Sequence, residues 1–273
     1  MAPRAAAYRR PVRVGTLNLA SGRDATGRSV DAAGLRSALA GLDVDVLAVQ
    51  EIDVRQPRSH HLCQPTEVAA ALGAVDWRFA ATVDGTPDPF RSWQPVDPPV
   101  LAGPDDAPAG PRYGIALFSR LSVRRWSVQA LGAGWARLPI HAPDPRTGRG
   151  RWWWFPDEPR LALAAELDRC TVVGAHLSFA PHTALRQLAR LRRWAGSLPG
   201  PVLLAGDLNL VGPVPATVFG AQRLVSGPSY PAPAPRVQFD HVLGPATLRP
   251  QRPEVRQLAL GDHRLVTVTV CPQ

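Results

Sequence analysis

The sequence contains no lysine, and arginine supplies all 31 of its strongly basic side chains. The formal net charge is +9 over 273 residues. An excess of positive charge attracts polyanions, such as nucleic acid or anionic lipid headgroups, through the long-range field of the protein. The charge therefore indicates an anionic partner and leaves the class of that partner open.

Cysteine is scarce. The three cysteines, Cys63, Cys170 and Cys271, are an odd number and show no C-x-x-C spacing. Such a set excludes the disulfide framework of a small secreted domain and gives no indication of a zinc site. Cys170 stands in an apolar run, which predicts a buried thiol.

Long apolar runs are absent too. No stretch of the sequence approaches the ~20 apolar residues that cross a bilayer. The N-terminal stretch MAPRAAAYRRPVRVG carries arginines and alanines but lacks the apolar centre of an export signal. We therefore expect a flexible leader over residues 1–11, a single domain over residues 12–273, and a cytoplasmic, monomeric protein.

The remaining pattern is one of short apolar runs separated by turns, which is typical of strands, with few helical segments. Many strands and few helices favour one α+β domain in which two sheets pack together and helices lie outside them. Pro/Gly/Asp-rich segments over 84–111 and 141–159 are expected to be long loops. Strands are predicted at 12–19, 45–50, 114–119, 161–167, 171–177, 201–206, 239–244 and 264–270, and helices at 31–41, 67–72 and 183–198, the last with Thr183 as N-cap.

Chemically capable polar residues stand at or near the ends of these strands. Each alone has an ordinary structural explanation, such as a turn, a solvated strand end or a buried core histidine. Together they supply the oxygen ligands that Mg²⁺ or Mn²⁺ prefers and the imidazoles and carboxylates that activate water in metal-assisted phosphoester hydrolysis. The set comprises Asn18, Glu51, His176, Asp207, Asn209, Asp240, Asp262 and His263.

The ordered motifs TLNL, VQEID, YGIALFSR, EPRLAL, GAHLS, AGDLNL, FDHVL and GDHRLV resemble those of the endonuclease/exonuclease/phosphatase superfamily, which has the deoxyribonuclease-I-like fold. The resemblance extends from about residue 12 to residue 270 and is closest to uncharacterised bacterial members. It implies a four-layer α/β/β/α sandwich of two packed mixed sheets. The sequence has Gly-Asp-His where the family usually has Ser-Asp-His, and both functional residues remain.

The resemblance also implies roles at the metal and at the attacking water. Glu51 resembles the principal Mg²⁺ ligand, with Asn18 and Asp262 completing or supporting the metal site. Asp207 resembles the residue that orients or deprotonates the nucleophilic water. His263 resembles the second catalytic imidazole.

On the phosphate side, Asp240 is expected to orient His263, and Asn209 to hold a phosphate oxygen or Asp207 itself. The resemblance implies that His176 either contacts the phosphate or protonates the leaving group. Arg160 in EPRLAL is a candidate phosphate-side arginine, and a structural salt bridge with Glu158 or another acid is an equal alternative.

These features predict a Mg²⁺-dependent hydrolase of phosphodiester bonds, with Mn²⁺ as the other candidate metal and nucleic acid as the favoured substrate, hence a nuclease. The first alternative is a phosphatase or phospholipase-type phosphodiesterase that acts on a phosphoinositide, a sphingolipid or another small phosphoester. The second alternative is a non-catalytic binding module. The segment RWWWF at 151–155 could stack on bases or enter a lipid interface; we favour a core-facing hairpin in which alternate tryptophans are buried.

Overall fold

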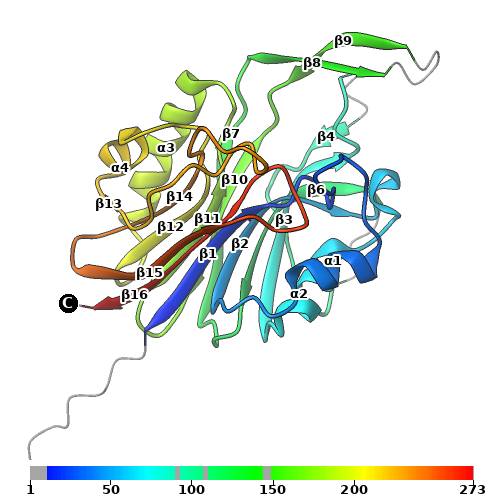
Figure 1. Cartoon of the computed structure of the whole chain (residues 1–273). Helices are drawn as coiled ribbons and strands as arrows, with labels where there is room; N and C mark the ends of the chain where they lie inside the picture. The colour runs from blue at the N-terminus through cyan, green and yellow to red at the C-terminus, as the bar shows by residue number, and fades with distance from the viewer. Residues whose placement is uncertain (1–10, 90–92, 107–109, 144–148, 273) are drawn as a thin grey trace, which may run out of the picture.

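The computed structural model describes residues 11–89, 93–106, 110–143 and 149–272, so residues 1–10, expected to be a leader, lie outside the described part. Two large mixed β-sheets pack face to face, and a separate two-stranded ribbon projects from one end (Figure 1). The expected fold class, a four-layer α/β/β/α sandwich, is confirmed.

The first sheet has eight strands, in the order β15-β16-β1-β2-β6-β3-β4, with β5 paired to β3. Strands β1 and β2 run parallel, and β1 pairs antiparallel with β16. The strands are β1 Val12–Asn18, β2 Val46–Val54, β3 Asp76–Gly85, β4 Trp93–Pro95, β5 Leu101–Ala102, β6 Arg112–Ser119, β15 Leu248–Arg256 and β16 Leu265–Pro272.

The second sheet has six strands, in the order β13-β14-β12-β11-β10-β7. Here β11 and β12 run parallel, whereas β14 runs antiparallel to β12. The strands are β7 Arg125–Gly132, β10 Arg160–Glu166, β11 Thr171–His176, β12 Val202–Asp207, β13 Gln222–Arg223 and β14 Asp240–Gly244. The ribbon consists of β8 Arg137–Pro143 and β9 Gly150–Pro156.

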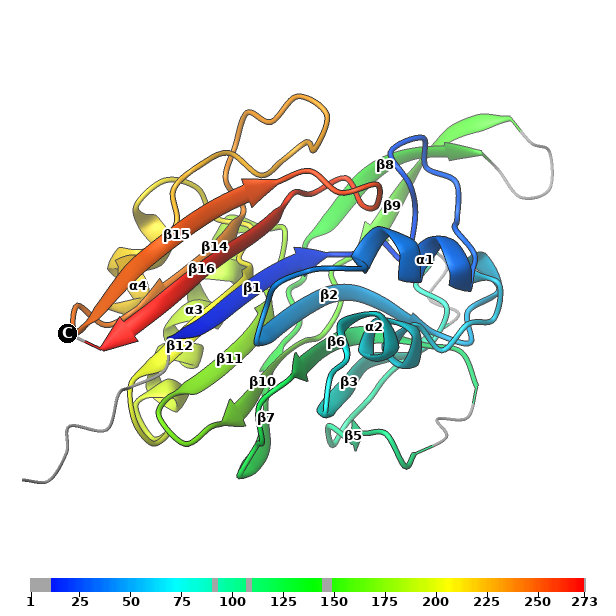
Figure 2. The ribbon, with the colours of Figure 1, turned by 60° about the horizontal axis from the view of Figure 1, so that its bottom comes forward.

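Helices cover the outer face of each sheet (Figure 2). The first sheet carries α1 Ala32–Leu39 and α2 Gln64–Leu72, with a short 3-10 turn at Pro57–Ser59. The second sheet carries α3 Pro181–Ala195 and α4 Val214–Phe219. Because each helix places its apolar stripe on a sheet, the outer layers form two further cores besides the one between the sheets.

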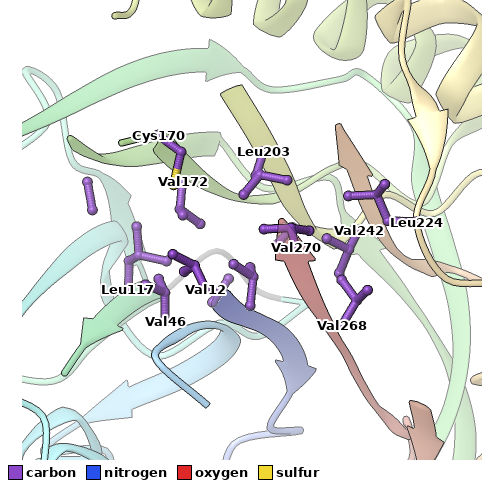
Figure 3. Packing of buried hydrophobic residues seen from close by; sticks show 14 of the residues in the cluster. Val12, Val46, Leu117, Cys170, Val172, Leu203, Leu224, Val242, Val268 and Val270 are labelled. Atoms are coloured by element: carbon purple, nitrogen blue, oxygen red, sulfur yellow. The ribbon is translucent and has the colours of Figure 1, made fainter. Parts of the chain in front are cut away.

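The core between the sheets is built mainly from valine, leucine and alanine side chains (Figure 3). Val14 and Val46 of the first sheet and Val172 and Val242 of the second are fully buried there. Side chains that alternate along each strand allow one face to meet the other sheet while the opposite face meets the helices. This rigid double sheet fixes the positions of all side chains that leave its strand ends.

The structure corrects several boundaries. Strand β2 continues through Glu51 to Val54, beyond the predicted end at residue 50. Helix α3 begins at Pro181 with Ala180 as its N-cap, so Thr183 lies inside the first turn and is not the cap. Proline at the first helical position needs no N–H partner, and this explains the earlier start.

Strands lie in both segments that were expected to be loops. The segment 84–111 contains β4 and β5, and the segment 141–159 contains β9 and the end of β8. Glycine and proline flank these short strands closely and hide the alternation on which a strand prediction depends.

The expected burial of alternate tryptophans in RWWWF is wrong. Trp152 and Trp154 are 64% and 58% exposed. Because they are two residues apart on β9, they share one face of the ribbon. The ribbon stands away from the double sheet (Figure 1), and Arg151 stacks on Trp153. Within the described residues, no sheet strand pairs with the ribbon and Trp152 and Trp154 belong to none of the buried cores, so these two side chains stay exposed.

The expectations about cysteine hold. All three cysteines are free, and Cys170 is buried. Within the described residues, no helix combines the length and the apolar character that crossing a bilayer requires.

Candidate functional site

Strand ends from both sheets meet at one edge of the sandwich. β1 ends at Asn18, β11 ends at His176, β12 ends at Asp207, and β14, which runs the other way, begins at Asp240. His176 is paired with Asp207, and Asp207 with Asp240, across neighbouring strands. Paired residues of adjacent strands point to the same face, so these three side chains form one row.

Glu51 reaches this edge through a β-bulge. The register between β2 and β6 shifts between Val49 and Ile52, and Glu51 has a φ of 53°. A positive φ is unfavourable for a glutamate, and such strain is usually retained where a bulge directs a side chain to a site. The N–H of Ser21 bonds to the Glu51 carbonyl at 2.9 Å and helps to hold this conformation.

Asp207 is held at the centre of the site by two donors. Asn18 Nδ2 donates to Asp207 Oδ2 at 3.1 Å and to Glu51 Oε1 at 3.0 Å. The backbone N–H of Asn209 donates to Asp207 Oδ1 at 3.1 Å. Asn209 has a φ of 49°, a conformation that asparagine tolerates better than most residues, and this brings its N–H back to the carboxylate.

The glycine before Asp207 is required by packing. A Cβ on Gly206 would overlap the carbonyl oxygen of Ala175 on β11. Because this position has no side chain, β12 lies close enough to β11 for His176 and Asp207 to stand side by side.

His263 is backed by a carboxylate. Its Nδ1 lies 2.8 Å from Asp240 Oδ2 and 3.7 Å from Asp207 Oδ2. Ser229 Oγ donates to the same Asp240 oxygen at 2.6 Å. Burial alone would lower the pKa of His263, but the charge and hydrogen bond of Asp240 and the charge of Asp207 raise it to about 10.

The partner of His176 is a cation, whereas that of His263 is a carboxylate. Arg160 Nη1 lies 3.0 Å from Nδ1 of His176, and both side chains are buried. Nε2 of His176 lies 3.8 Å from Asp207 Oδ2, which is too long for a hydrogen bond. Burial, followed by the charges of Arg160 and His263, holds the pKa of His176 well below its usual value.

The acidic side chains of the site disfavour one another's ionisation. Burial raises the pKa of Glu51, and the charges of Asp262 and Asp207 raise it further. Burial also raises the pKa of Asp207, and the charge of Asp240 adds to the effect. Glu51 is half-buried and Asp262 is exposed, so this group of carboxylates opens toward solvent. A divalent cation would relieve the repulsion, and the donor chemistry fits Mg²⁺ or Mn²⁺.

A second set of donors can hold a metal. One ligand atom each from Asp207, Asp240 and His263 lie within 4.8 Å of one another, and all three residues are buried. They form a possible metal site. Asp240 and the Nδ1 of His263 are already hydrogen-bonded to each other, so a cation that used both atoms would have to replace that bond.

The residues predicted from sequence lie together at this edge, although their individual roles stay predictions. Two contacts add detail that the sequence left open. The Asn209 side chain donates to the carbonyl oxygen of Leu177 at 3.0 Å, and its backbone N–H, not its amide, contacts Asp207. Arg160 contacts His176, and its Nη2 lies 3.9 Å from Asp157 Oδ1, which is an ion pair with an acid other than Glu158.

Sequence reasoning missed three supporting residues. Ser229 bonds to Asp240, and the ring of Tyr230 lies 4.7 Å from that of His263. Arg58 makes a two-pronged ion pair with buried Asp53, at 2.8 and 2.9 Å, two residues after Glu51. None belongs to a recognisable motif; the Ser-Tyr-Pro turn before FDHVL was the available signal for the first two.

Comparison with known proteins gives a consistent result. The sequence pattern of the Endonuclease/Exonuclease/phosphatase family matches residues 15–263. No protein with a curated description matches the chain.

Several solved structures share the fold. An endonuclease/exonuclease/phosphatase from Beutenbergia cavernae DSM 12333 is 20% identical with a TM-score of 0.65, over 97% of this chain and 72% of the other. The mannosyl-6-phosphatase of Bacteroides thetaiotaomicron VPI-5482 is 13% identical with a TM-score of 0.59, over 95% and 99%. Sphingomyelinase C from Streptomyces griseocarneus is 17% identical with a TM-score of 0.51, over 95% and 99%.

Proposed function

The chain belongs to the endonuclease/exonuclease/phosphatase family, and we propose that it is a divalent-metal-dependent phosphodiesterase that acts on nucleic acid. The observation that supports the chemistry is the position of Asp207. Its carboxylate is fixed by Asn18 and Asn209 and lies between two imidazoles at the open edge of the sheets.

Glu51, Asn18 and Asp262 are the residues that would hold the cation. When bound, the cation supplies charge neutralisation of a phosphate oxygen and of the leaving oxygen. Asn18 also sets the separation between Glu51 and Asp207, because its Nδ2 donates to both carboxylates. Its Oδ1 accepts a hydrogen bond from the N–H of Ala20 at 3.0 Å, which fixes the orientation of the amide.

In the reaction, a water oxygen forms a bond to phosphorus as the bond from phosphorus to the leaving ester oxygen breaks. Asp207 accepts one water proton, and its raised pKa makes it a better base than a free aspartate. Asp240 occupies Nδ1 of His263, so Nε2 is the nitrogen that can exchange a proton with the substrate. The leaving oxygen takes the Nε2 proton of His263 and ends as a hydroxyl, while solvent removes the proton from Asp207 and restores the one on His263. The products are a phosphomonoester and an alcohol.

The preference for a polymer is supported by an arginine-lined depression of about 650 Å³ between α3 and β7. Arg186, Arg190 and Arg193 line it, with Trp194 beside them. Among the described residues, no carboxylate lies within ion-pair distance of these three arginines. Helix α3 begins five residues after His176, so a strand bound at the site could continue along this surface.

The test is hydrolysis of single- and double-stranded DNA, RNA and a phospholipid panel, with Mg²⁺ or Mn²⁺ and with EDTA. Asp207→Ala and His263→Ala should each lose about 10²-fold or more of kcat, since each removes a group placed at the reacting atoms. Asp168→Ala, which removes an exposed carboxylate paired with Arg124, serves as the matched control and should keep full activity.

Unchanged activity in Asp207→Ala would contradict the mechanism. Turnover of phospholipid without turnover of any nucleic acid would contradict the choice of substrate and leave the chemistry intact.

A second candidate, a phosphodiesterase that acts on lipid headgroups, has one observation in its favour. Trp152 and Trp154 project from the β8–β9 ribbon into solvent, and tryptophan is enriched where one end of a side chain is apolar and the other wet. Sphingomyelinase C is among the proteins with this fold. If this candidate is right, Trp152→Ala/Trp154→Ala should lose activity on vesicles and keep it on soluble esters.

A further inference from the structure

We infer that Arg160 is a positioning residue that fixes His176 as the Nε2–H tautomer, so that His176 is a neutral hydrogen-bond donor to the phosphate and not the acid that protonates the leaving group. The role of His176 rests on the proposed phosphodiesterase function. Its tautomer does not.

The hydrogen-bonding chemistry of arginine decides the tautomer. Arg160 Nη1 lies 3.0 Å from Nδ1 of His176. A guanidinium has only donors and keeps its charge in proteins, so Nδ1 must be the acceptor and must carry no proton. The ring proton of His176 is therefore on Nε2. A doubly protonated ring would place a second donor against the guanidinium.

The surroundings of Arg160 hold its charge in place. It lies beside a register shift in the pairing of β10 with β7, and its side chain is buried. Asp157 Oδ1 lies 3.9 Å away, and the charge of Glu158 acts on the guanidinium as well. These two acids compensate the buried cation without occupying the nitrogen that faces His176.

The N–H of His176 points toward the reacting groups. Within the described residues, Nε2 makes no hydrogen bond, and Asp207 Oδ2 lies 3.8 Å from it. The charged groups that act on the ring are Arg160 from β10, Asp207 from β12 and His263 from the loop before β16. With Nδ1 turned to the guanidinium as an acceptor, the ring has a single donor, Nε2–H, and this donor is directed into the site, where a phosphate oxygen would lie.

The two histidines of the site differ in the charge of the residue that faces Nδ1. Nδ1 of His263 faces a carboxylate, Asp240, whereas Nδ1 of His176 faces a guanidinium. A carboxylate partner stabilises an imidazolium and a guanidinium opposes one. The two histidines of the site are thus prepared for different tasks by the residues behind them.

The first test is NMR of the full-length protein with ¹⁵N-labelled histidine, at pH 7 and without metal. We expect the Nδ1 of His176 to give an unprotonated-type shift and the Nε2 a protonated-type shift, with the resonance assigned by its loss in His176→Gln. Arg160→Lys keeps a charged donor and should retain this tautomer. Arg160→Met should give the averaged shifts of a ring that exchanges between tautomers.

Arg13→Met is the matched control. Arg13 is equally buried and contacts Glu254, Thr267 and Thr269. It lies in the other sheet, near the start of β1, whereas the site is at the end of β1. The substitution should lower stability and leave the His176 shifts unchanged. A protonated Nδ1 in the wild type, or unaltered shifts in Arg160→Met, would overturn the inference.

The second test compares two phosphodiesters with different leaving groups: bis(4-nitrophenyl) phosphate, whose nitrophenolate needs no proton to leave, and a dinucleotide, whose alkoxide needs one. Loss of a donor to the phosphate lowers kcat on both by the same factor, about 10²-fold in His176→Ala. His176→Gln keeps an N–H near the Nε2 position and should recover most of that loss.

The inference fails if His176→Ala is impaired on the dinucleotide and nearly normal on the nitrophenyl ester, because that pattern marks a proton donor. If the wild type hydrolyses neither ester, the proposed function fails instead, and the NMR experiment still decides the tautomer.

Discussion

Asn18 at the end of β1 donates its Nδ2–H to Asp207 Oδ2 at the end of β12, across 3.1 Å, and so joins the two sheets at their catalytic edge. The same amide nitrogen holds Glu51 at 3.0 Å. One side chain therefore sets the separation between the predicted metal ligand and the predicted base.

Replacement of Asn18 by alanine should lower activity more than stability. The loss of two hydrogen bonds to carboxylates is expected to cost about 1–3 kcal/mol of unfolding free energy, and Asp207 and Glu51 are then free to move apart. We expect kcat/KM to fall about 10²-fold. Urea denaturation and steady-state kinetics measure the two effects.

Gln222→Ala is the control, since that amide bonds to the carbonyl oxygens of Pro245 and Leu248 away from the site. It should reduce stability by a comparable amount and leave kcat/KM unchanged. Equal losses of activity in both variants would show that the effect of Asn18 is merely structural.

Glu51→Gln should stabilise the metal-free protein and abolish its response to metal. The substitution removes a charge whose ionisation is opposed by burial, Asp262 and Asp207. Wild type should gain about 2.7 kcal/mol when Mg²⁺ or Mn²⁺ is present at about 100 times its Kd, and the variant should gain nothing. Thermal denaturation with and without EDTA measures both. Glu67→Gln, at an ion pair with Arg36 between α1 and α2, should respond to metal as the wild type does.

Stability of the metal-free protein should fall as the pH rises above 7. The folded pKa of His263 is about 10, against about 6.5 in the unfolded chain. The folded state therefore binds the extra proton between these values, and the stabilisation is complete below pH 6.5 and is lost as the pH approaches the folded value. The slope should reach about 1.4 kcal/mol per pH unit.

The interval from pH 7 to 8.5 suits this measurement, because it lies above the pKa of histidine in the unfolded chain, about 6.5, and below the folded pKa of His263. Burial raises the pKa of Cys170 to about 11, so that thiol contributes mainly above this interval. Denaturation with EDTA at pH 7.0, 7.75 and 8.5 should show the slope in the wild type and a much flatter line in Asp240→Asn. Parallel lines would exclude the Asp240–His263 pair as its origin.

Arg190→Ala/Arg193→Ala should weaken binding of a polynucleotide without changing the hydrolysis of a dinucleotide. For each arginine–phosphate ion pair that the substitutions remove, the slope of log Kd against log salt should decrease by about 0.7–0.9. Filter binding over a salt series measures this. Arg249→Ala/Arg252→Ala removes the same charge from β15 and should leave the slope nearly unchanged; an equal change in both pairs would mean that net charge alone is responsible.

The arrangement of the site could be predicted largely because its residues stand where strands end. Parallel strands bring their carboxyl ends to one edge, so Asn18 in one sheet and His176 and Asp207 in the other had to converge once the two sheets were paired correctly. The motif order supplied that pairing.

Other features could not be predicted from local patterns. The partner of Arg160 depends on a register shift in the pairing of β10 with β7, and Glu51 reaches the site through a bulge in β2. Both are set by pairing with strands distant in sequence. The exposure of Trp152 and Trp154 was missed for a related reason. Alternation along a strand shows which residues share a face, but it does not show whether another element packs on that face.

Gly206 places a limit on how the site can change. Since any side chain there would collide with the carbonyl of Ala175, the glycine must persist even in a descendant that has lost Asp207 and with it the chemistry. The Gly-Asp pair thus meets two separate requirements, one for the spacing of β11 and β12 and one for the proposed chemistry. A chain that meets only the first of them would retain the fold and give up the reaction.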